Sequence, residues 1–369
     1  MLTRLVDGPS LRRFYADAFR AAGVPAAHAE IASDGIYYAD RHGLDSHGVA
    51  GFLRIYLRMV ESAEVDARAV PRVVAGDDAC ATVDGCNGFG FIAGHFAMDE
   101  AIERARCFGI GAVAVRNSSH AGAMGFYAHQ AREAGMLGVA LTNLGREGML
   151  PPPGGVVPLV GTNVLAVAAP TKHEAPFSLD MSTAVVSAGR VRLAARRREP
   201  VPDGWLADAE GRSVLDPTAL DRGTAILRFL GGAVETGAHK GFGLALVADI
   251  LCGVLSGAAV GPTRDKLDGS AVSTGRKDAD IGHFFLALRI GAFGDEMRFA
   301  ARLDEMLGTV RQCPPSRAGC LVTYPGMPEA AIAAERVRAG IPMEPALLDG
   351  LVSAAARLDV SPPQELPAQ

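Results

Sequence analysis

Residues 110–142 read IGAVAVRNSSHAGAMGFYAHQAREAGMLGVALT, and this stretch decides the fold class. The runs 110–115 and 137–142 are apolar and bounded by glycine, which is typical of buried strands. Residues 127–134 between them predict a helix. Because strand, helix and strand follow one another here, we expect a mixed α/β domain in which helices pack on a sheet.

The pattern changes towards both ends of the chain. Further strands are predicted at 81–83, 163–169, 177–181 and 284–288, and further helices at 96–106 and 242–255. Helical spacing of apolar residues also runs through 10–75 and through three tail segments, 298–311, 329–339 and 345–358. We therefore expect a helical domain built from residues 1–76 and 310–369, with an α/β domain of residues 77–309 inserted into it.

Composition argues against several classes of protein. The chain has 369 residues, 49% of them hydrophobic, and its 36 Lys and Arg against 41 Asp and Glu give a formal net charge of −5. Without a basic stripe for phosphates, we expect no nucleic-acid partner. The start lacks the apolar core of a signal peptide, and no run of about 18 apolar residues occurs, so we expect a cytoplasmic protein outside the membrane. The 6 scattered cysteines predict no metal site.

A first candidate for chemistry is His47, in the tetrapeptide Asp45-Ser-His-Gly48. The tetrapeptide precedes an amphipathic run, 49–60, so Asp45 or Ser46 is expected to cap a helix whose first turn carries His47. The positive end of a helix disfavours the charged imidazolium, so a proton-donating His47 needs a carboxylate nearby. The alternative is an ordinary cap beside an incidental, exposed histidine.

Two further candidates follow predicted strands. His120 lies on a strand-to-helix turn, where α/β proteins place ligands, although a histidine bonded within its own loop is the alternative. Asp180 ends a hydrophobic strand, where a carboxylate is costly to bury without a partner such as a histidine. Its alternative role is the N-cap of a helix beginning at Ser182.

Two glycine-containing motifs raise the question of a nucleotide. Lys240, just before the long apolar segment 242–255, offers a cation at a helix start, where an anionic group binds well, or else it is simply solvated. Gly88-Phe-Gly-Phe-Ile-Ala93 fits the dinucleotide fingerprint, but the next strand ends in Val115-Arg-Asn117 without the acid that binds a ribose. We therefore interpret the Gly88 match as accidental.

The motifs that carry a family resemblance run in order along nearly the whole chain. They are Leu44-Asp-Ser-His-Gly-Val49, Asn117-Ser-Ser-His-Ala-Gly122, Leu141-Thr-Asn143, Gly161-Thr-Asn163, Ala168-Ala-Pro-Thr171, Leu179-Asp-Met-Ser-Thr183, Pro200-Val-Pro-Asp-Gly-Trp205, Lys240-Gly-Phe-Gly-Leu-Ala245, Ile281-Gly-His-Phe-Phe285, Tyr324-Pro-Gly326 and Ala339-Gly-Ile-Pro342. Together they resemble the type-2 malate/L-lactate dehydrogenase family. That family includes malate, sulfolactate and ureidoglycolate dehydrogenases, diketogulonate reductase, and piperideine- or pyrroline-2-carboxylate reductases.

The resemblance implies a fold and a reaction. The implied fold is a non-Rossmann α/β fold, with a central mixed-sheet cofactor domain beside a helical domain formed by both termini, usually in a homodimer. The implied reaction is reversible hydride transfer between NAD(P)H and the carbon next to a carboxylate. The substrate is then a 2-hydroxy or 2-oxo acid or, as an alternative, a cyclic 2-imino acid. A third reading is a catalytically lapsed relative that binds nucleotide.

The resemblance also assigns roles to residues. His47 is implied as the general acid/base, Asp180 as the carboxylate that orients and charges it, Ser46 as an adjacent hydrogen-bonding group, and His120 as a second active-site histidine. Implied cofactor contacts are Thr142, Asn143, Asn163, Ser178, Met181, Ser182, Thr183, Lys240, Gly241 and Gly326. Lys172 follows Thr171 where a 2′-phosphate would be received, so NAD and NADP both stay open.

One departure from the family pattern concerns the substrate. The family usually carries an arginine four residues after the first histidine, a bidentate partner for the substrate carboxylate, and here that position is Gly51. Arg54, three residues further on, is the expected substitute. Arg146, in an unusually charged loop, is a second candidate for the same role.

Overall fold

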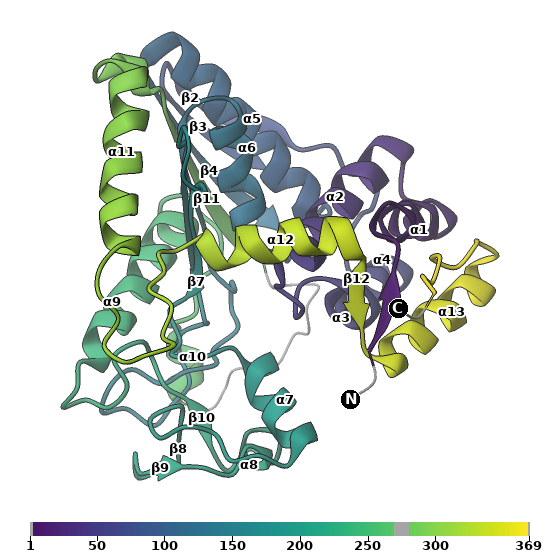
Figure 1. Cartoon of the computed structure of the whole chain (residues 1–369), viewed down its shortest axis with the longest axis vertical. Coiled ribbons are helices and arrows are strands. Elements are labelled where there is room, and N and C mark those ends of the chain that lie inside the picture. Colours follow the sequence, from purple (N-terminus) through teal and green to yellow (C-terminus); the bar gives the residue numbers. More distant parts are fainter. Residues whose placement is uncertain (1–2, 269–279, 368–369) are drawn as a thin grey trace.

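The computed structural model describes residues 3–268 and 280–367, and its centre is a mixed β-sheet (Figure 1). In spatial order the strands are β2 (Arg72–Asp77), β3 (Cys80–Asp84), β4 (Ile110–Ser118), β11 (Ile281–Leu288), β5 (Leu137–Thr142), β6 (Val164–Ala169) and β7 (Phe177–Ser182). Strands β3 and β4 are parallel, whereas every other neighbouring pair in this sheet is antiparallel. The expected α/β class with a central mixed sheet is confirmed.

Helices cover the sheet. Helix α5 (Gly90–Phe108) packs on β3, β4 and β11, and α6 (Gly125–Glu133) packs on β5, β6 and β7. Helix α9 (Ala238–Ala248) contacts β6, and its π-helical continuation η2 (Asp249–Val254) contacts β4, β5 and β11. Figure 1 shows α9 on the opposite side of the sheet from α5 and α6. Alanines of the strands and of α5 and α6 fill the interface, which lets the helices approach the sheet closely.

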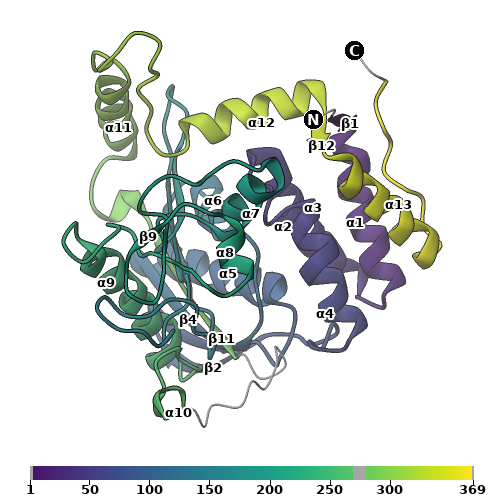
Figure 2. The same ribbon diagram turned by 90° about the horizontal axis from the view of Figure 1, so that it is seen from below.

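Elements from both ends of the chain lie together beside the sheet (Figure 2). They are β1 (Arg4–Val6), α1 (Gly8–Ala21), α2 (Ala26–His42), α3 (Val49–Gly51), the π-helical η1 (Phe52–Tyr56), α4 (Leu57–Glu61), α12 (Met327–Ala339), β12 (Ile341–Met343) and α13 (Pro345–Leu358). Strand β1 pairs with β12, α12 packs on α2, and α13 packs on α1. The tail helices α12 and α13 therefore meet the opening helices, as their similar patterns suggested.

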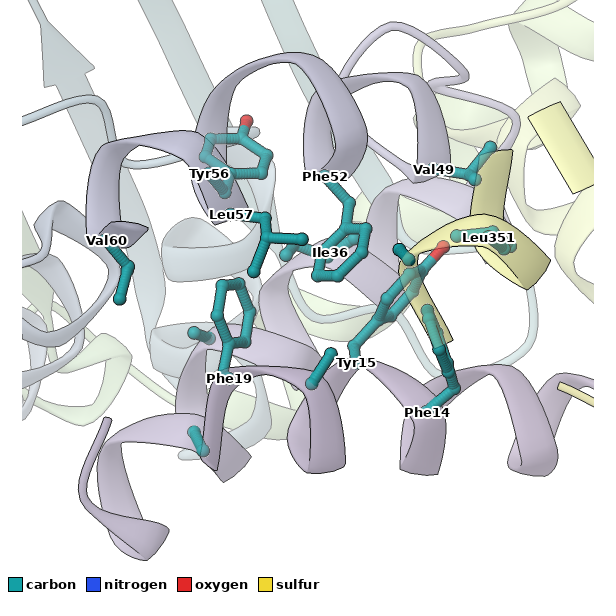
Figure 3. Close-up of a cluster of buried hydrophobic side chains, with 14 of the residues drawn as sticks. Phe14, Tyr15, Phe19, Ile36, Val49, Phe52, Tyr56, Leu57, Val60 and Leu351 are labelled. Atoms are coloured by element: carbon teal, nitrogen blue, oxygen red, sulfur yellow. The ribbon is translucent and has the colours of Figure 1, made fainter. Parts of the chain in front are cut away.

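Aromatic side chains form the core of this helical part (Figure 3). The ring of Phe52 is 5.8 Å from that of Phe14, 4.7 Å from Tyr15 and 5.4 Å from Phe19, measured between centroids. Phe52 is the first residue of η1, so the packing fixes the segment that directly follows the His47 turn. Edge-to-face and tilted ring pairs of this kind add roughly 0.5–1.5 kcal/mol each beyond their buried area.

The remaining elements form a small layer at one end of the main sheet and a helix at its side. They are α7 (Ala188–Arg197), β8 (Leu206–Ala207), β9 (Ser213–Val214), α8 (Thr218–Asp221), β10 (Ile226–Leu227), α10 (Arg264–Leu267), η4 (Ile290–Ala292) and α11 (Glu296–Arg311). Strands β10, β8 and β9 pair in that order. Within the described residues, no helix is long and apolar enough to cross a membrane.

The periodicity of apolar residues in the sequence predicted which helices and strands form more accurately than it predicted where they begin and end. The predicted strand 137–142 and helix 345–358 have the bounds of β5 and α13. The expected helix 96–106 begins earlier, at Gly90. A Cβ atom at Gly90 would lie 2.2 Å from the carbonyl oxygen of Ser119. Glycine in the Gly88 motif is thus required by close packing between α5 and the loop that carries His120. The long segment 242–255 is divided into α9 and η2.

Candidate active site

His47 lies in the turn between α2 and α3. The turn begins at Gly43, whose φ of 79° is in the left-handed region that glycine adopts without strain. The prediction that Asp45 or Ser46 caps the following helix is wrong, because the cap residue is Gly48 and the Val49 N–H donates to Asp40 instead. The Ser46 hydroxyl does not cap the helix because it is hydrogen-bonded to the side chain of His47, with 2.8 Å between Oγ and Nδ1.

Asp45 has a different role from the predicted one. Its carboxylate, which is exposed, lies 3.0 Å from a guanidinium nitrogen of Arg336 on α12. The same guanidinium donates to the main-chain oxygen of Asp40 at the end of α2. Asp45 therefore ties its turn to the C-terminal helices rather than capping α3.

His120 lies directly beside His47. The two imidazole rings are nearly parallel, 21° apart, with 5.7 Å between their centroids. The Nδ1 atom of His120 accepts a bond from the Gly122 N–H at 3.3 Å, and the ring lies 5.6 Å from that of Tyr56 on η1. Two histidines that are 73 positions apart in the chain thus meet in one place, and both are half-buried.

Asp180 does not join this pair. It lies inside strand β7 rather than at a helix start, so its expected alternative as an N-cap is wrong; α7 begins at Ala188, capped by Ser187. The Asp180 carboxylate accepts a bond from the Gly125 N–H at 2.8 Å, and among the described residues no hydrogen bond links it to His47. Burial, and to a smaller extent the charge of Glu329, raise the pKa of Asp180 to about 6, against the bond from the Gly125 N–H, which lowers it.

The electrostatics of His47 follow from this arrangement. Burial, and then the positive charge of Arg54, lower the pKa of His47 to about 4. The imidazole is therefore neutral at pH 7, because no carboxylate among the described residues offsets its desolvation. A neutral imidazole at this place can accept a proton on its unprotonated nitrogen, and it must first gain that proton before it can act as a general acid.

Arg54 reaches the site through an irregular helix. It lies on η1, where the chain makes a single π-helical segment between α3 and α4, a feature that is frequent at functional sites. Its side chain is exposed, and its charge is felt at His47. At Gly51, a Cβ atom would lie 2.9 Å from the Tyr56 ring, so this position has no space for a longer side chain.

Arg146 lies elsewhere. Burial lowers the pKa of Lys266 on α10, and the charge of Arg146 lowers it further, so these two cations are neighbours. Of the two arginines predicted to replace the one missing at Gly51, Arg54 is thus the one whose charge acts on His47.

The comparison with known families gives a match that covers most of the chain. Residues 6–352 match the family model described as malate/L-lactate dehydrogenase. The chain belongs to this dehydrogenase family. A malate dehydrogenase of Pyrococcus abyssi is 36% identical over 338 residues, which cover 92% of this chain and 90% of the relative.

Solved structures agree with this family assignment. The malate dehydrogenase of Entamoeba histolytica superposes with a TM-score of 0.90 at 26% identity, covering 100% of both chains. The delta1-piperideine-2-carboxylate reductase of Pseudomonas syringae pvar. tomato superposes with a TM-score of 0.80 at 26% identity, covering 96% of this chain and 100% of the other. The chain is therefore an oxidoreductase of this dehydrogenase family, and such a family implies a nicotinamide cofactor.

The side chain of Asn143, one of the implied cofactor contacts, makes all of its hydrogen bonds to other groups of the chain. Its amide nitrogen donates to Asp249 at 3.0 Å and to the carbonyl of Ala259 at 2.8 Å. Its amide oxygen accepts from the N–H groups of Gly145 at 3.0 Å and Gly282 at 2.9 Å. All four hydrogen-bonding positions of the side chain are used, so the side chain shapes the loop after β5 and has none left for a ligand.

Other members of the implied cofactor set also have internal partners. The Thr142 hydroxyl bonds to the ring of His283 at 2.8 Å, and the Thr183 hydroxyl donates to the carbonyl of Thr162 at 3.1 Å. The Asn163 amide donates to the carbonyl of Ala245 at 2.8 Å. These residues line the ends of β5, β6 and β7 and hold the strands in place.

Two glycines of the set are required by close packing. A Cβ at Gly241 would lie 2.5 Å from the main chain of Leu230, and one at Gly326 would lie 2.4 Å from the carbonyl oxygen of Pro176. Gly326 also has a φ of 98°, in the left-handed region, and is the N-cap of α12. The N–H of Ser178, another member, donates to the carbonyl of Pro325, so α12 is joined here to β7.

The remaining residues of the implied cofactor set have side chains that are accessible to a ligand. Met181 and Ser182 are half-buried at the end of β7. Lys240 is exposed in the first turn of α9, where its charge and the helix dipole favour an anion, although the N–H groups of Ala238, Lys240 and Gly241 already donate to carbonyls of the chain. A Cβ at Gly189, on α7, would lie 3.3 Å from the Cβ of Ser46, so the connection from β7 to α7 passes beside the His47 turn. This chemistry fits a dinucleotide whose phosphates lie near Lys240.

Lys172 lies in a turn that already holds an anion. The main-chain N–H groups of Lys172, His173 and Glu174 donate to the carboxylate of Asp304 on α11, at 3.2, 2.9 and 3.2 Å. The Lys172 side chain is exposed. Any 2′-phosphate at this turn would meet the lysine but also the Asp304 carboxylate.

Sequence reasoning missed three buried polar residues around the site. Asp40 anchors the His47 turn, His283 joins the ends of β4 and β5 through Ser118 and Thr142, and Tyr38 lies beside Asp180. The available signal was a polar group at a position where helical or strand periodicity predicts an apolar one. Within the described residues, no group of three or more His, Cys, Asp or Glu side chains is placed to hold a metal.

Proposed function

We propose that this chain is an NAD(P)-dependent oxidoreductase that transfers a hydride between nicotinamide and the carbon next to a carboxylate, interconverting a 2-hydroxy acid and a 2-oxo acid. The observation that carries this proposal is the pair His47 and His120, 5.7 Å apart, with the charge of Arg54 acting on the same place. A proton acceptor and an anchor for an anion are the groups that such a substrate needs. The malate dehydrogenases to which the chain is similar support the substrate class.

His47 is the general base in the direction of oxidation. For its Nε2 to accept a proton, Nδ1 must carry one, and Nδ1–H then donates to the Ser46 hydroxyl at 2.8 Å. The substrate hydroxyl gives its proton to Nε2 as the hydride leaves the same carbon. In the reverse direction, the imidazolium returns this proton to the oxygen. His120, stacked beside it, confines the substrate to one side of the His47 ring.

The cofactor supplies the hydride or accepts it. The ammonium of Lys240, in the first turn of α9, would hold its phosphates, and Met181 and Ser182 would border it at the end of β7. We propose NAD as the preferred form, because the main-chain N–H groups of Lys172 and His173 already donate to the Asp304 carboxylate, and this negative charge repels a 2′-phosphate. The exposed ammonium of Lys172 is the one feature here that favours NADP.

Arg54 is proposed to bind the substrate carboxylate. Its guanidinium is exposed on η1, and its charge lowers the pKa of His47, so it is electrostatically coupled to the base. A carboxylate that neutralises Arg54 removes this effect and raises the basicity of His47 when substrate binds. Substrate binding and proton transfer are therefore linked through Arg54.

Reduction of a cyclic 2-imino acid is the second candidate function. The observation that favours it is the neutral state of His47, because a protonated imine arrives with its own proton and needs none from the enzyme. The similarity to the piperideine-2-carboxylate reductase is consistent with this candidate. The catalytically lapsed relative is the outcome if no substrate turns over.

We propose that the chain forms a homodimer. Large apolar side chains are exposed along one face of α9 and η2 and along α11. They are Leu244, Val247, Ile250, Val254, Met297, Met306 and Val310. A cavity of about 1040 Å³ lies against α11 and η4. Exposed apolar surface of this extent is typical of contacts between subunits, and light scattering of the purified protein measures the mass directly.

The deciding experiment follows the oxidation of NADH and of NADPH by absorbance with a panel of 2-oxo acids and cyclic 2-imino acids. Turnover of a 2-oxo acid with NADH supports the proposal, and turnover of imino acids alone selects the second candidate. Absence of turnover together with absence of binding in a fluorescence titration of both cofactors would contradict the oxidoreductase. The same titration compares the two cofactors and tests the preference for NAD.

A further inference from the structure

Asp40 is a buried carboxylate next to the His47 turn. It lies near the end of α2, and only 1% of its surface is exposed. One carboxylate oxygen accepts the Val49 N–H at 2.9 Å, and the other accepts the Tyr15 hydroxyl at 2.8 Å. Because Val49 is two residues after His47 and begins α3, this bond fixes the end of the turn that presents the imidazole.

The sequence around the turn is adapted to this carboxylate. A Cβ at Gly48 would lie 1.9 Å from the Oδ1 atom of Asp40, so residue 48 must be glycine for the carboxylate to reach the main chain. On the other side, Arg336 donates to the main-chain oxygen of Asp40 and pairs with Asp45. The turn is thus held at both ends by groups from outside it.

We propose that Asp40 is a positioning residue for His47: its carboxylate binds the first N–H of α3 and thereby sets where the imidazole lies relative to His120 and Arg54. This inference rests on the proposed function, because it assigns Asp40 a purpose in proton transfer. Asp40 does not contact substrate or cofactor and acts only through the turn. The hydroxyl of Tyr15, on α1, donates a hydrogen bond to the second carboxylate oxygen of Asp40 and so aligns the carboxylate.

The charge state of Asp40 supports a role other than stability. Burial raises the pKa of Asp40 to about 7, against the Val49 N–H and Tyr15 hydroxyl, which lower it. Other groups facing it are Asp45, which raises its pKa, and Arg336, which lowers it. Between about pH 4 and 7 the folded chain keeps a proton that the unfolded chain has lost, so the free energy of unfolding falls as pH rises. Ionised Asp40 therefore costs stability at neutral pH.

Three variants separate positioning from general folding. Asp40→Ala removes the acceptor, and Asp40→Asn keeps an oxygen for the Val49 N–H while its amide donates to Tyr15. Asp34→Ala is the matched control, because Asp34 also lies on α2 and bonds to α1, through Arg12, but is remote from the turn. Each variant is measured for amide hydrogen exchange, cofactor binding, and kcat and KM from pH 5.5 to 9.

We expect Asp40→Ala to lower kcat roughly tenfold or more, with cofactor affinity within about twofold of the unsubstituted protein, and to speed exchange roughly tenfold in the peptide that contains residues 44–52. Asp40→Asn should keep both within about threefold and remove an ionisation near pH 7 from the kcat profile. The control should change neither. A merely structural role of Asp40 would not remove an ionisation from the kcat profile of Asp40→Asn while kcat itself is retained.

Two results would overturn the inference. One is an Asp40→Ala protein with unchanged exchange in residues 44–52 and unchanged kcat. The other is faster exchange throughout α1 and α2 in both Asp40→Ala and Asp34→Ala, which would mean a loss of helix packing. If the unsubstituted protein turns over no substrate, the proposed function fails by itself, and the exchange of residues 44–52 still decides whether Asp40 holds the turn.

Discussion

Two polar groups lie beside the ends of sheet strands and differ in how their hydrogen-bonding atoms are used. The His47 pair is His47 with His120, and the Asn143 cluster is Asn143 with its partners Gly145, Asp249, Ala259 and Gly282. Asn143 uses all four of its hydrogen-bonding positions on groups of the chain itself. Among the described residues, the side chain of His47 makes one hydrogen bond, to Ser46, and its ring stacks against that of His120. Both residues belong to motifs of the family, so motif membership alone does not separate a residue that binds a ligand from one that shapes the wall.

Unused hydrogen-bonding capacity makes the distinction. A buried polar group is normally paired within the protein, and one that is already saturated gains nothing from a ligand. His47 keeps one ring nitrogen for a substrate, and its lowered pKa shows that no internal acid compensates its burial. We infer that chemistry occurs at the His47 pair, and that the Asn143 cluster fixes the strands around it.

The sharpest test is replacement of the base itself. His47→Ala should lower kcat roughly 10²–10⁴-fold, because the hydroxyl proton then has no acceptor in place. The melting temperature should change little, since within the described part of the chain the His47 side chain makes a single hydrogen bond, to Ser46. Steady-state kinetics with the best substrate of the panel measures the loss, and Asp34→Ala, on α2 and remote from the turn, is a control. Unchanged turnover of every accepted substrate would remove His47 from the mechanism.

The pH dependence tests the neutral state of His47. With a pKa of about 4, the base form of His47 predominates above pH 5. In the Asp40→Asn protein, which lacks the ionisation of Asp40 near pH 7, kcat/KM for oxidation of the hydroxy acid should therefore be flat from pH 6 to 8. Reduction of the oxo acid needs the imidazolium, whose fraction falls tenfold per pH unit, so this rate should drop roughly 100-fold over the same range. Profiles measured in both directions decide the matter. A reduction rate that stays flat to pH 8 would mean that another acid donates.

Arg54 is expected to affect binding more than chemistry. Arg54→Ala should raise KM for the acid substrate roughly 10–100-fold, because a charge-assisted bond to a carboxylate contributes about 1.5–3 kcal/mol. Arg54→Lys should recover part of this affinity, since charge is kept and the fork geometry is lost. The same two variants should leave the affinity for the cofactor, measured by titration, within about twofold. An unaltered KM in Arg54→Ala would leave the carboxylate without its proposed anchor.

The sequence predicted the fold class and most elements, because their signals are local. The strand at 137–142 and the helix at 345–358 show this clearly, since glycine bounds and helical spacing act within a few residues. The division of 242–255 into α9 and η2, and of 49–61 into α3, η1 and α4, was not predicted. A π-helical segment depends on what packs around it, and its residues have an ordinary helical pattern.

The candidate site was predicted in its residues but only in part in its geometry. That His47 and His120 meet is consistent with their motifs, whereas Asp180 as the partner of His47 was expected and its carboxylate instead bonds to Gly125. Asp40 was overlooked, because a single Asp within a helix gives no sign that its carboxylate reaches a main-chain N–H nine residues later. Long-range hydrogen bonds of this kind leave no periodic trace in the sequence.

At Asn143 the expected effect is on stability. Asn143→Ala leaves Asp249 and two main-chain N–H groups without their partner in a buried place, which costs about 1–3 kcal/mol for each such group that water does not reach. The free energy of unfolding in urea should fall accordingly, and the slope of the unfolding curve should not change. Cofactor affinity of the folded fraction should stay within about threefold. A large loss of affinity without a loss of stability would make Asn143 a ligand-binding residue after all.

Arg146 should show the smallest effect and completes the comparison between the two regions. It lies in the loop that Asn143 shapes, beside Lys266, and its exposed guanidinium acts on that lysine rather than on His47. Arg146→Ala should therefore leave KM for the acid substrate within about twofold, because an exposed charge in high dielectric contributes at most about 1 kcal/mol. Measured at low and at 0.5 M added salt, the difference from the unsubstituted protein should vanish, since salt screens exposed charges. A tenfold rise in KM that persists at high salt would place the substrate carboxylate at Arg146, and the Asn143 cluster would then belong to the binding site rather than to its support.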